Sequence, residues 1–419
     1  MAARAQTVLL SLALALVGLN LGGCQRRMPA GAAANVAAGA TTVAQVDRLS
    51  VLRANDSADA GAGFALANTP RRFEFPQDHG PHPLFRHEWW YFTGQLRGAG
   101  ETFGFELTVF RLALRPPRAT ASSSAADSAW RARQVYAAHF AITDVSRHSF
   151  FNATRYARDA LNLAGAQARP FAIHVADWSV IEAAGAPPQT LHWQLQAADG
   201  DYQLRLDLRC AQPPVLNGAA GLSRKADAPG AASYYYSMPR LQATGALSRR
   251  GISLPVSGVV WLDREWGSGS LGADQQGWDW FALDLNDGST LMFYALRDRN
   301  GRRDAHSAGT FVDAAGEVTP LRNDDVEITV QRHWRSPRGG LYPAQWALRV
   351  RSLDLQLNVT PLLADQELST QPRYWEGAVQ VTGQRHGTAV SAQGYVELVG
   401  YAQNQASPSV PSASTPPTH

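Results

Sequence analysis

The sequence predicts an all-β protein with two β domains packed side by side. Short alternating strands separated by turns recur along the chain, and helical periodicity is scarce. Two aromatic hairpins far apart in the sequence also resemble each other. Their first strands, Trp89–Leu96 and Trp278–Leu285, carry Trp, Phe and Leu at the same places, and each is followed by a short glycine-containing turn and an aromatic-rich returning strand. We therefore expect two domains of related architecture.

The first 23 residues have the pattern of a bacterial signal peptide. Arg4 precedes an apolar run, Val8–Leu19, that is shorter than a membrane span. The run ends in Leu21-Gly22-Gly23-Cys24, which resembles a lipobox, where the cysteine thiol receives the lipid. A plain secretory signal with an accidental cysteine is the alternative. We expect a lipoprotein anchored through Cys24 in the cell envelope, in the outer membrane and facing the periplasm.

The segments outside the two domains have distinct compositions. Residues 24–70 are rich in Ala, Gly, Asp and Asn, which predicts a flexible tether, and residues 403–419 are rich in Ser, Pro and Thr, which predicts a disordered tail. The net charge is +3 without a dense basic run, so nucleic acid is not an expected partner. After lipidation only Cys210 remains, which excludes an intrachain disulfide.

The two domains are expected at residues 71–244 and 245–402. In the first, strands around residues 88–96 and 102–112 flank a turn, and a Ser/Ala-rich loop is expected at residues 116–127. In the second, Asn286-Asp287-Gly288 is a strong hairpin signal between two apolar strands. Further alternating strands are expected at residues 202–208, 326–330, 346–350 and 353–359.

Four consecutive aromatic residues, Trp89, Trp90, Tyr91 and Phe92, follow His87 and Glu88. A strand with apolar residues on both faces must have both faces covered. In a barrel, one face fills the interior while the other packs on a neighbouring domain. Trp90 and Phe92 should share one face, and Trp89 and Tyr91 the other.

Several motifs carry a family resemblance. The stretch His87–Gly94 resembles the opening signature of the AttH/CrtC group, which includes carotenoid 1,2-hydratase. Similar matches follow in the same order at residues 139–144, 234–241, 260–268, 277–281, 374–377 and 394–401. The resemblance therefore covers roughly residues 70 to 401.

This resemblance implies two lipocalin-like β-barrel domains and a site for an apolar ligand. It does not fix the chemistry, because the group includes hydratases, pericyclases that fold polyenes, and lipoproteins encoded beside ABC-type exporters. Many members are labelled secreted hydrolases, but no Gly-x-Ser-x-Gly elbow and no Ser/His/Asp set stands in this sequence. The aromatic residues expected around the ligand are Trp89, Trp90, Tyr91, Phe92, Tyr234, Tyr236, Trp261, Trp266, Trp278 and Trp280.

Asp263 is the candidate general acid. Hydrating an isolated C=C bond needs a protonated acid near neutral pH, and an apolar pocket supplies it by raising the pKa of a carboxyl group. In carotenoid hydratases a Tyr-x-Asp pair donates the proton, and Asp263 matches the aspartate of that pair. The sequence departs from the pattern, because Trp261 replaces the tyrosine and the upstream His-x-Trp pair has no clear match.

Each candidate acid also has a structural interpretation. Asp263 can cap a turn or pair with Arg264 or Arg240, and Glu265 can belong to a buried ion pair. Asp279 either points into a cavity as a catalytic group or caps a strand edge. Glu88 has the same choice, with Arg86 and Arg111 as possible partners.

A metal site is a further alternative. His79, His82 and His87 lie close together in the sequence with Asp78 and Glu88. Zinc needs convergent ligands, and Pro81 and Pro83 favour an extended segment here, so we expect no metal and no cofactor.

Two functions remain open at the level of sequence. The first is a membrane-anchored carrier of a long apolar ligand, a lipid or polyene, acting with an ABC-type exporter. The alternative is an enzyme of the carotenoid 1,2-hydratase type, with Asp263 as the acid and Glu265 and Asp279 as further catalytic candidates.

Overall fold

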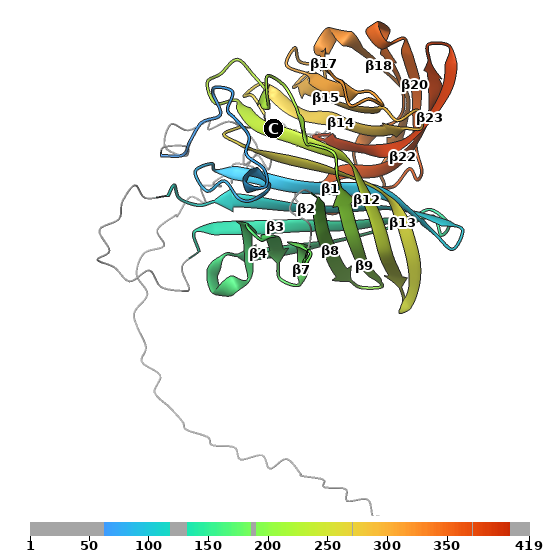
Figure 1. The fold of residues 1–419 in the computed structure, drawn as a ribbon. Coiled ribbons are helices and arrows are strands. Elements are labelled where there is room, and N and C mark those ends of the chain that lie inside the picture. Colours follow the sequence, from blue (N-terminus) through green and yellow to red (C-terminus); the bar gives the residue numbers. More distant parts are fainter. Residues whose placement is uncertain (1–62, 118–131, 186–189, 270, 371, 403–419) are drawn as a thin grey trace, which may run out of the picture. The chain divides into compact units, whose positions relative to one another are not determined.

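The computed structural model describes residues 63–117, 132–185, 190–269, 271–370 and 372–402. The predicted signal peptide, Cys24, the whole of the predicted tail and most of the tether and of the loop at residues 116–127 lie outside these ranges. The described residues fold into two curled antiparallel sheets, which confirms the all-β prediction (Figure 1).

Helical structure in the described ranges is confined to single 3-10 turns, and none is long and apolar enough to cross a membrane. These turns are η2 (Gln77–His79), η3 (Ala160–Asn162), η4 (Asn323–Asp325) and η5 (Arg351–Leu353).

The first sheet has thirteen strands in the order β4-β3-β2-β1-β13-β12-β9-β8-β7-β6-β5, with β10 and β11 paired to β12. Its two ends approach each other, because β3 and β4 contact β5 and β6. The strands are β1 (His87–Gly98), β2 (Glu101–Ala113), β3 (Gln134–Asp144), β4 (Ser149–Arg158), β5 (Ala164–Ala168), β6 (Phe171–Val175), β7 (Trp178–Glu182), β8 (Leu191–Asp199), β9 (Tyr202–Cys210), β10 (Val215–Leu216), β11 (Leu222–Arg224), β12 (Ala232–Arg249) and β13 (Ile252–Gly267).

The second sheet has ten strands in the order β17-β16-β15-β14-β23-β22-β20-β19-β18, with β21 paired to β22. It curls around its own apolar core. The strands are β14 (Gln275–Leu285), β15 (Thr290–Asp298), β16 (Ala308–Val312), β17 (Val318–Arg322), β18 (Val326–Arg335), β19 (Leu341–Val350), β20 (Leu355–Pro361), β21 (Glu367–Leu368), β22 (Tyr374–Arg385) and β23 (Thr388–Val399).

The two aromatic hairpins occupy equivalent places in the two sheets. Strand β1 pairs with the following strand β2 and with β13, the last strand of its sheet. Strand β14 likewise pairs with the following strand β15 and with β23, the last strand of its sheet. The predicted likeness of the hairpins therefore extends to their pairing partners.

The chain passes from one sheet to the other later than the predicted boundary between residues 244 and 245. That boundary falls inside β12, which continues to Arg249 and pairs with β13 along most of its length. Both strands belong to the first sheet, so the transition lies between Gly267 and Gln275. The turn at Arg250–Gly251 is a hairpin within the first sheet, not a link between domains.

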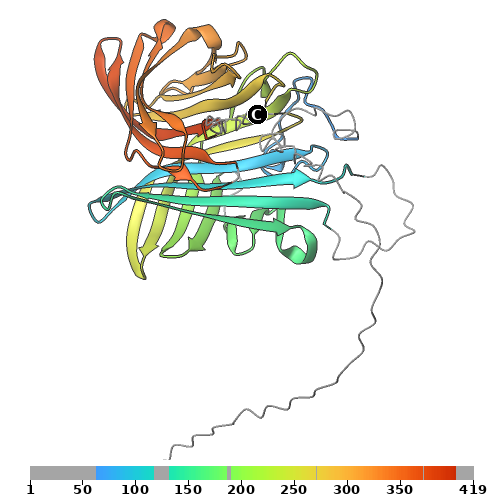
Figure 2. The ribbon, with the colours of Figure 1, turned by 180° about the vertical axis from the view of Figure 1, so that it is seen from behind.

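The two sheets pack through the outer faces of β1, β2 and β12 against β14, β22 and β23 (Figure 2). The side chain of Gln95 donates hydrogen bonds to the carbonyl oxygens of Val379 at 2.7 Å and Gly394 at 3.0 Å. The second sheet can approach closely at Gly104 because this residue has no side chain: a Cβ there would lie 2.6 Å from the Ala378 Cβ. These contacts hold the sheets together at one end of their interface.

The first described residues are already part of the body. The backbone N–H of Ala67 donates to the hydroxyl of Ser268 at 3.0 Å, and Ala67 is buried. The N–H of Ala65 donates to the carbonyl of Leu84 at 2.9 Å. The predicted tether, which extends to residue 70, therefore ends several residues too late.

Candidate functional site

A cavity of about 840 Å³ lies between the two sheets. Its volume is in the upper part of the range of small-molecule sites, about 300–1,000 Å³. Strands β1, β2, β3, β4, β12 and β13 form one wall, and β14, β15 and β23 form the facing wall together with Tyr374 of β22. Most of the lining is apolar or aromatic, including Trp89, Tyr91, Phe110, Tyr156, Leu163, Tyr235, Trp278, Trp280, Tyr294 and Tyr374.

The aromatic residues of β1 divide between the two faces as predicted. Trp90 and Phe92 point into the core of the first sheet. Trp89 and Tyr91 lie on the outer face, where they belong to the apolar cluster between the sheets. In β14 the same alternation sends Phe281 into the second core and Trp280 toward the cavity. Each strand thus builds a barrel core and a cavity wall at once.

Asp263 lines the cavity and is almost fully buried. Its Oδ1 accepts hydrogen bonds from the hydroxyl of Ser237 at 2.5 Å and the indole N–H of Trp261 at 2.7 Å. Its Oδ2 accepts a hydrogen bond from the hydroxyl of Tyr235. Burial raises the pKa of Asp263 to about 7, although these three donors act in the opposite direction.

The ion pairs considered for Asp263 do not form. Arg264, its neighbour on the strand, points to the opposite face and pairs with Glu88. Arg240 pairs with Asp284. Within the described ranges, no cation forms a salt bridge with Asp263, so no opposite charge compensates its burial and the protonated form persists up to about pH 7.

Glu265 belongs to a buried ion pair beside Asp263. The ammonium of Lys225, the only lysine of the chain, lies 3.2 Å from its carboxylate. The hydroxyl of Ser233 donates a second hydrogen bond to the same oxygen. Lys225 also lies 4.0 Å from the ring centre of Tyr294. Both charged groups line the cavity, and the pair gives this end of it a fixed dipole.

Glu397 is a second acid in the cavity lining, on the wall opposite Asp263. Its carboxyl accepts a hydrogen bond from the indole N–H of Trp278 at 3.1 Å, and burial raises its pKa to about 8. Trp280 stands directly opposite Glu397 in the sheet, and its indole N–H donates to the Tyr235 hydroxyl at 3.1 Å. A continuous chain of contacts thus runs from Glu397 to Asp263.

Two further glutamates are buried next to this wall. Glu376 accepts a hydrogen bond from the Tyr91 hydroxyl at 2.5 Å, and burial raises its pKa well above the usual range. Glu106 accepts one from Tyr374 at 3.2 Å, and burial raises its pKa to about 7. His139 bonds to the same Tyr374 hydroxyl at 2.7 Å, and burial lowers the pKa of His139 to about 4.

The structure places Asp279 away from the cavity. It shares a strand face with Phe281 and therefore points into the second barrel. There it pairs with Arg297 at 2.8 Å and accepts a hydrogen bond from Tyr401 at 2.9 Å. Its neighbours on β14, Trp278 and Trp280, take the cavity positions instead.

Five of the aromatic residues expected around the ligand, Trp90, Phe92, Tyr234, Tyr236 and Trp266, lie in the first barrel core. Trp89, Tyr91, Trp278 and Trp280 do line the cavity, and Trp261 lies beside it as a donor to Asp263. Tyr235, which was not among the expected aromatic residues, also lines the cavity and stands opposite Glu265 in the register.

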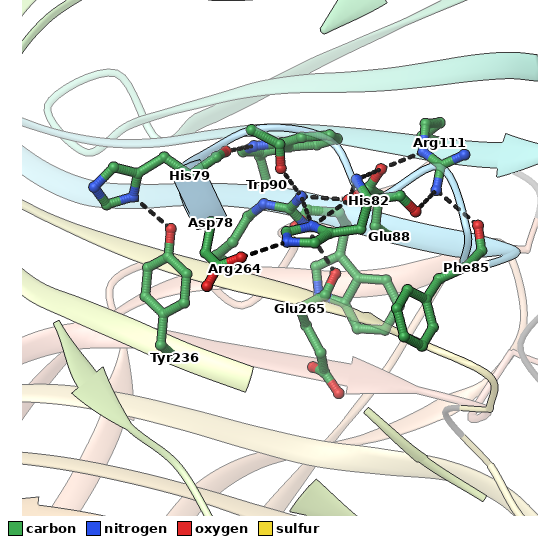
Figure 3. Close-up of polar contacts among 12 residues, drawn as sticks. Asp78, His79, His82, Phe85, Glu88, Trp90, Arg111, Tyr236, Arg264 and Glu265 are labelled. Atoms are coloured by element: carbon green, nitrogen blue, oxygen red, sulfur yellow. Dashed lines mark hydrogen bonds and ion pairs between the residues drawn. The ribbon is translucent and has the colours of Figure 1, made fainter. Parts of the chain in front are cut away.

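Two histidines of residues 79–87, His79 and His82, make their contacts inside the first barrel (Figure 3). His82 stacks on Trp266 with ring centres 3.7 Å apart, and its ring nitrogens contact Asp78 at 3.0 Å and Glu88 at 3.2 Å. His79 bonds to the hydroxyl of Tyr236 at 2.6 Å. His87 lies separately, in the cavity lining. The three rings therefore do not converge on one point.

Glu88 is the centre of that network. Arg111 and Arg264 both pair with its carboxylate, and Arg264 also lies over the Trp90 ring at 3.8 Å. Although burial opposes ionisation, the two arginines and His82 hold the pKa of Glu88 well below its usual range. Arg111 was one of the two partners proposed from the sequence, and Arg264 joins it from β13.

The fold and the cavity define a class of protein, a pair of lipocalin-like β-barrels with an apolar cavity between them. The chain belongs to the AttH-like family, whose model matches residues 66–401. A solved AttH-type protein from Nitrosomonas europaea is 33% identical, with a TM-score of 0.69, and the match covers 81% of this chain and 100% of that one.

Two relatives carry names of enzymes. The crystal structure of kievitone hydratase from Nectria haematococca shares the fold, with a TM-score of 0.60 and 16% identity over 81% of this chain and 97% of that one. The dehydratase asqC of Emericella nidulans is 23% identical over 229 residues, 49% of this chain. The match spans 60% of the length of that dehydratase.

Proposed function

We propose that this protein adds water to, or removes it from, a C=C bond of an apolar substrate held between the two barrels. The observation that carries the proposal is Asp263, a buried carboxyl in the wall of an aromatic cavity, with three hydrogen-bond donors and a pKa of about 7. An acid with a pKa near the working pH is best suited to general acid catalysis.

The reaction needs one proton donor, one water and a stabilised cation. The neutral carboxyl of Asp263 gives its proton to one alkene carbon, and the π electrons form the new C–H bond. The adjacent carbon becomes cationic, and the faces of Trp280 and Tyr235 stabilise it. Water attacks that carbon and releases a proton to solvent, and the Asp263 carboxylate takes up a proton from solvent, so the product is an alcohol and the acid is regenerated. Dehydration is the same path in reverse.

Glu397 is the group proposed to orient the water. It faces Asp263 across the cavity and is linked to it through Trp280 and Tyr235. Attack from the face opposite the proton donor then adds the two parts of water to opposite sides of the double bond. The Lys225–Glu265 ion pair places two opposite charges in the cavity lining and orients an oxygen-bearing part of the substrate.

The family context supports this chemistry. Both enzyme names among the relatives describe the gain or loss of water, a hydratase and a dehydratase. The tyrosine that the carotenoid hydratases place two residues before the aspartate is absent here, where Trp261 stands. Tyr235 reaches the same carboxyl from the adjacent strand β12 and takes over as the hydroxyl partner of the acid.

The direct test is hydration of an acyclic carotenoid in ¹⁸O-labelled water, followed by mass spectrometry of the product. Asp263→Asn should lower the rate roughly 10²- to 10⁴-fold, the usual contribution of a general acid. Asp279→Asn is the matched control, because it removes a buried carboxyl that does not line the cavity. Unchanged turnover in Asp263→Asn, or an equal loss in the control, would exclude Asp263 as the acid.

A second candidate function is transport of an apolar ligand without chemistry. The size and apolar lining of the cavity favour it, and so does the expected lipid anchor, which would place the cavity beside a membrane. An ABC-type exporter is the partner proposed for this role. Native mass spectrometry of the protein extracted from its own membrane would distinguish the two functions: a carrier retains an unmodified lipid or polyene, whereas the enzyme also yields a hydrated product.

The anchor itself is proposed at Cys24, in the outer membrane. Metabolic labelling with an alkyne fatty acid should mark the wild-type chain, and Cys24→Ser should remove the label. The remaining cysteine, Cys210, is buried, so Cys210→Ser is the control and should keep the label. A Cys24→Ser chain that still carries the fatty acid would contradict the anchor.

A further inference from the structure

One end of the cavity opens at a rim of exposed apolar side chains. Tyr156 and Leu163 line the cavity and are also 68% and 45% exposed. Leu161, in the same region, is 49% exposed, and Leu114 is exposed as well. We call these four residues the rim patch. Exposed apolar side chains are ordinary when scattered, but a contiguous group at the mouth of a cavity marks an interaction surface.

The register places the rim patch at one end of three neighbouring strands, β2, β3 and β4. Strand β2 ends beside the start of β3, where the N–H of Leu114 donates to the carbonyl of Arg133 at 2.9 Å. Strand β3 pairs with the end of β4, so Ala137 stands opposite Tyr156. After β4 the chain enters η3, which contains Leu161, and Leu163 follows η3 directly (Figures 1 and 2). All four residues thus lie at the same end of strands β2 to β4.

An unusual backbone conformation exposes the side chains of Leu161 and Leu163. Leu161 has a φ of 57°, in the left-handed region that leucine rarely adopts. Such a conformation in a non-glycine residue is a reason to look for function. Asn162, which follows, has a φ of 56°. The two residues turn the chain so that Leu161 and Leu163 are both exposed beside the cavity.

Two positively charged arginines beside the rim patch favour binding to an anionic surface. Arg115 follows Leu114, and Arg158 lies between Tyr156 and Leu161; both arginines are exposed. Arg158 also lines the cavity. Arginine side chains beside exposed apolar groups are the combination that binds the interface of anionic bilayers.

The N-terminal part of the chain joins the body at the same rim. Gly63, the first described residue, packs against Pro116, since a Cβ on Gly63 would lie 2.9 Å from the Pro116 ring. The expected anchor, Cys24, precedes Gly63 by 63 − 24 = 39 residue steps. The described chain thus begins beside the rim.

We propose that the rim patch docks on an anionic phospholipid bilayer, so that an apolar ligand passes between the membrane and the cavity without crossing water. Tyr156, Leu161 and Leu163 enter the interface between headgroups and acyl chains, while Arg115 and Arg158 contact lipid phosphates. This surface acts whether the ligand is later hydrated or only carried.

The test uses residues 47–419 without the anchor. This region is one compact unit, and its solved AttH-type relative corresponds over its full length to 81% of this chain, so the body folds without the N-terminal segment. Binding is measured by co-sedimentation with vesicles of phosphatidylglycerol and phosphatidylcholine, and with vesicles of phosphatidylcholine alone. The wild type should bind the anionic vesicles and bind the neutral ones more weakly.

The variant Tyr156→Ser/Leu161→Ser/Leu163→Ser should lower the partition coefficient tenfold or more. Ile252→Ser/Val318→Ser/Leu341→Ser is the matched control, because it removes three exposed apolar side chains at other sites and should bind as the wild type does. Arg115→Gln/Arg158→Gln should weaken binding to the anionic vesicles and leave binding to the neutral ones unchanged. Circular dichroism and Tm should be the same in all four proteins.

Three outcomes would overturn the proposal. The first is that the wild type binds no protein-free vesicles. The second is that the control variant loses as much binding as the rim variant. The third is binding to native membranes that protease treatment of those membranes abolishes, with none to protein-free vesicles; this would assign the rim to a protein partner.

Discussion

Glu88 and Asp263 lie on neighbouring strands, β1 and β13, and both carboxyl groups are buried. Glu88 faces the interior of the first barrel, where Arg111 and Arg264 pair with it. Asp263 faces the cavity, where only neutral donors reach it. The pKa of Glu88 is held far below its usual range, and that of Asp263 is raised to about 7.

The comparison separates burial from its compensation. Burial disfavours the charged form of both groups. In the barrel, two guanidinium groups offset that cost, so Glu88 is ionised and structural. In the cavity, hydrogen bonds from Tyr235, Ser237 and Trp261 offset only part of it, so Asp263 keeps its proton near neutral pH. One strand pairing therefore carries a charge network on one face and a neutral acid on the other.

The largest effect is expected from breaking the barrel network. Arg264→Met removes one partner of a fully buried carboxylate, which should lower the free energy of unfolding by roughly 3–5 kcal/mol. Urea denaturation at pH 7 measures the change. Arg302→Met is the control, because Arg302 forms an exposed pair with Asp298 and should cost less than about 1 kcal/mol. Similar losses in the two variants would show that the Glu88 network is not the structural centre of the barrel.

A smaller effect is expected for the cavity acid, Asp263. Its contribution to stability depends on pH in the opposite direction to that of Glu88. The pKa of Asp263 is higher in the folded state than the ordinary 3.8, so its contribution to stability is present below pH 4 and is lost as the pH rises through 7. Relative to Asp263→Asn, the wild type should therefore lose on the order of a few kcal/mol between pH 4 and pH 8. The contribution of Glu88 has the reverse dependence, because its pKa is lowered, and it is lost as the pH falls below about 4.5.

Urea denaturation of both proteins at several pH values measures this term, since Glu88 and Glu106 are present in both and cancel in the difference. The charge of Asp263 also raises the pKa of Glu397, so the difference includes that coupling. A difference between wild type and Asp263→Asn that does not change with pH would mean that Asp263 is ionised in the folded protein, as Glu88 is.

The smallest effect should come from Tyr235→Phe. It removes one hydrogen bond to the Asp263 carboxyl, worth about 1 kcal/mol of stability. The Tyr235 hydroxyl stabilises the carboxylate form of Asp263. Its loss should therefore raise the pKa of Asp263 and move the alkaline limit of hydration to higher pH. The pH profile of turnover is the measurement, and Tyr234→Phe, in the barrel core, is the control. A limit that moves to lower pH would contradict the assigned direction of the bond.

Much of the fold could be predicted because it follows from local pattern. Alternation assigned Trp90 and Phe92 to one face of β1 and Trp89 and Tyr91 to the other, and the two clusters confirm this. The turns at residues 98–101 and 286–289 were also visible. The boundary between the sheets was not, because β12 and β13 are long strands whose partner is decided by pairing across the sheet and not by composition.

The site was harder to predict for the same reason. Three consecutive tyrosines, residues 234–236, show no alternation, so the sequence could not say that Tyr235 faces Asp263 while its neighbours fill the barrel. The register of β12 against β13 decides this, and a slip by one residue would exchange the faces. Glu397 was not predicted because it comes from the last strand of the other sheet, and the acid that it faces across the cavity, Asp263, is 134 positions away (397 − 263).

The cavity lies between two sheets that each have a core of their own, and contacts such as those of Gln95 and Gly104 join the sheets outside the cavity. Substitutions in the cavity wall therefore need not weaken either barrel core. Over evolutionary time, such an arrangement lets ligand preference diverge while the scaffold stays constant. For the protein engineer, it means that the pocket can be widened or reshaped from Trp89, Trp278 and Trp280 with the two barrels left as they are.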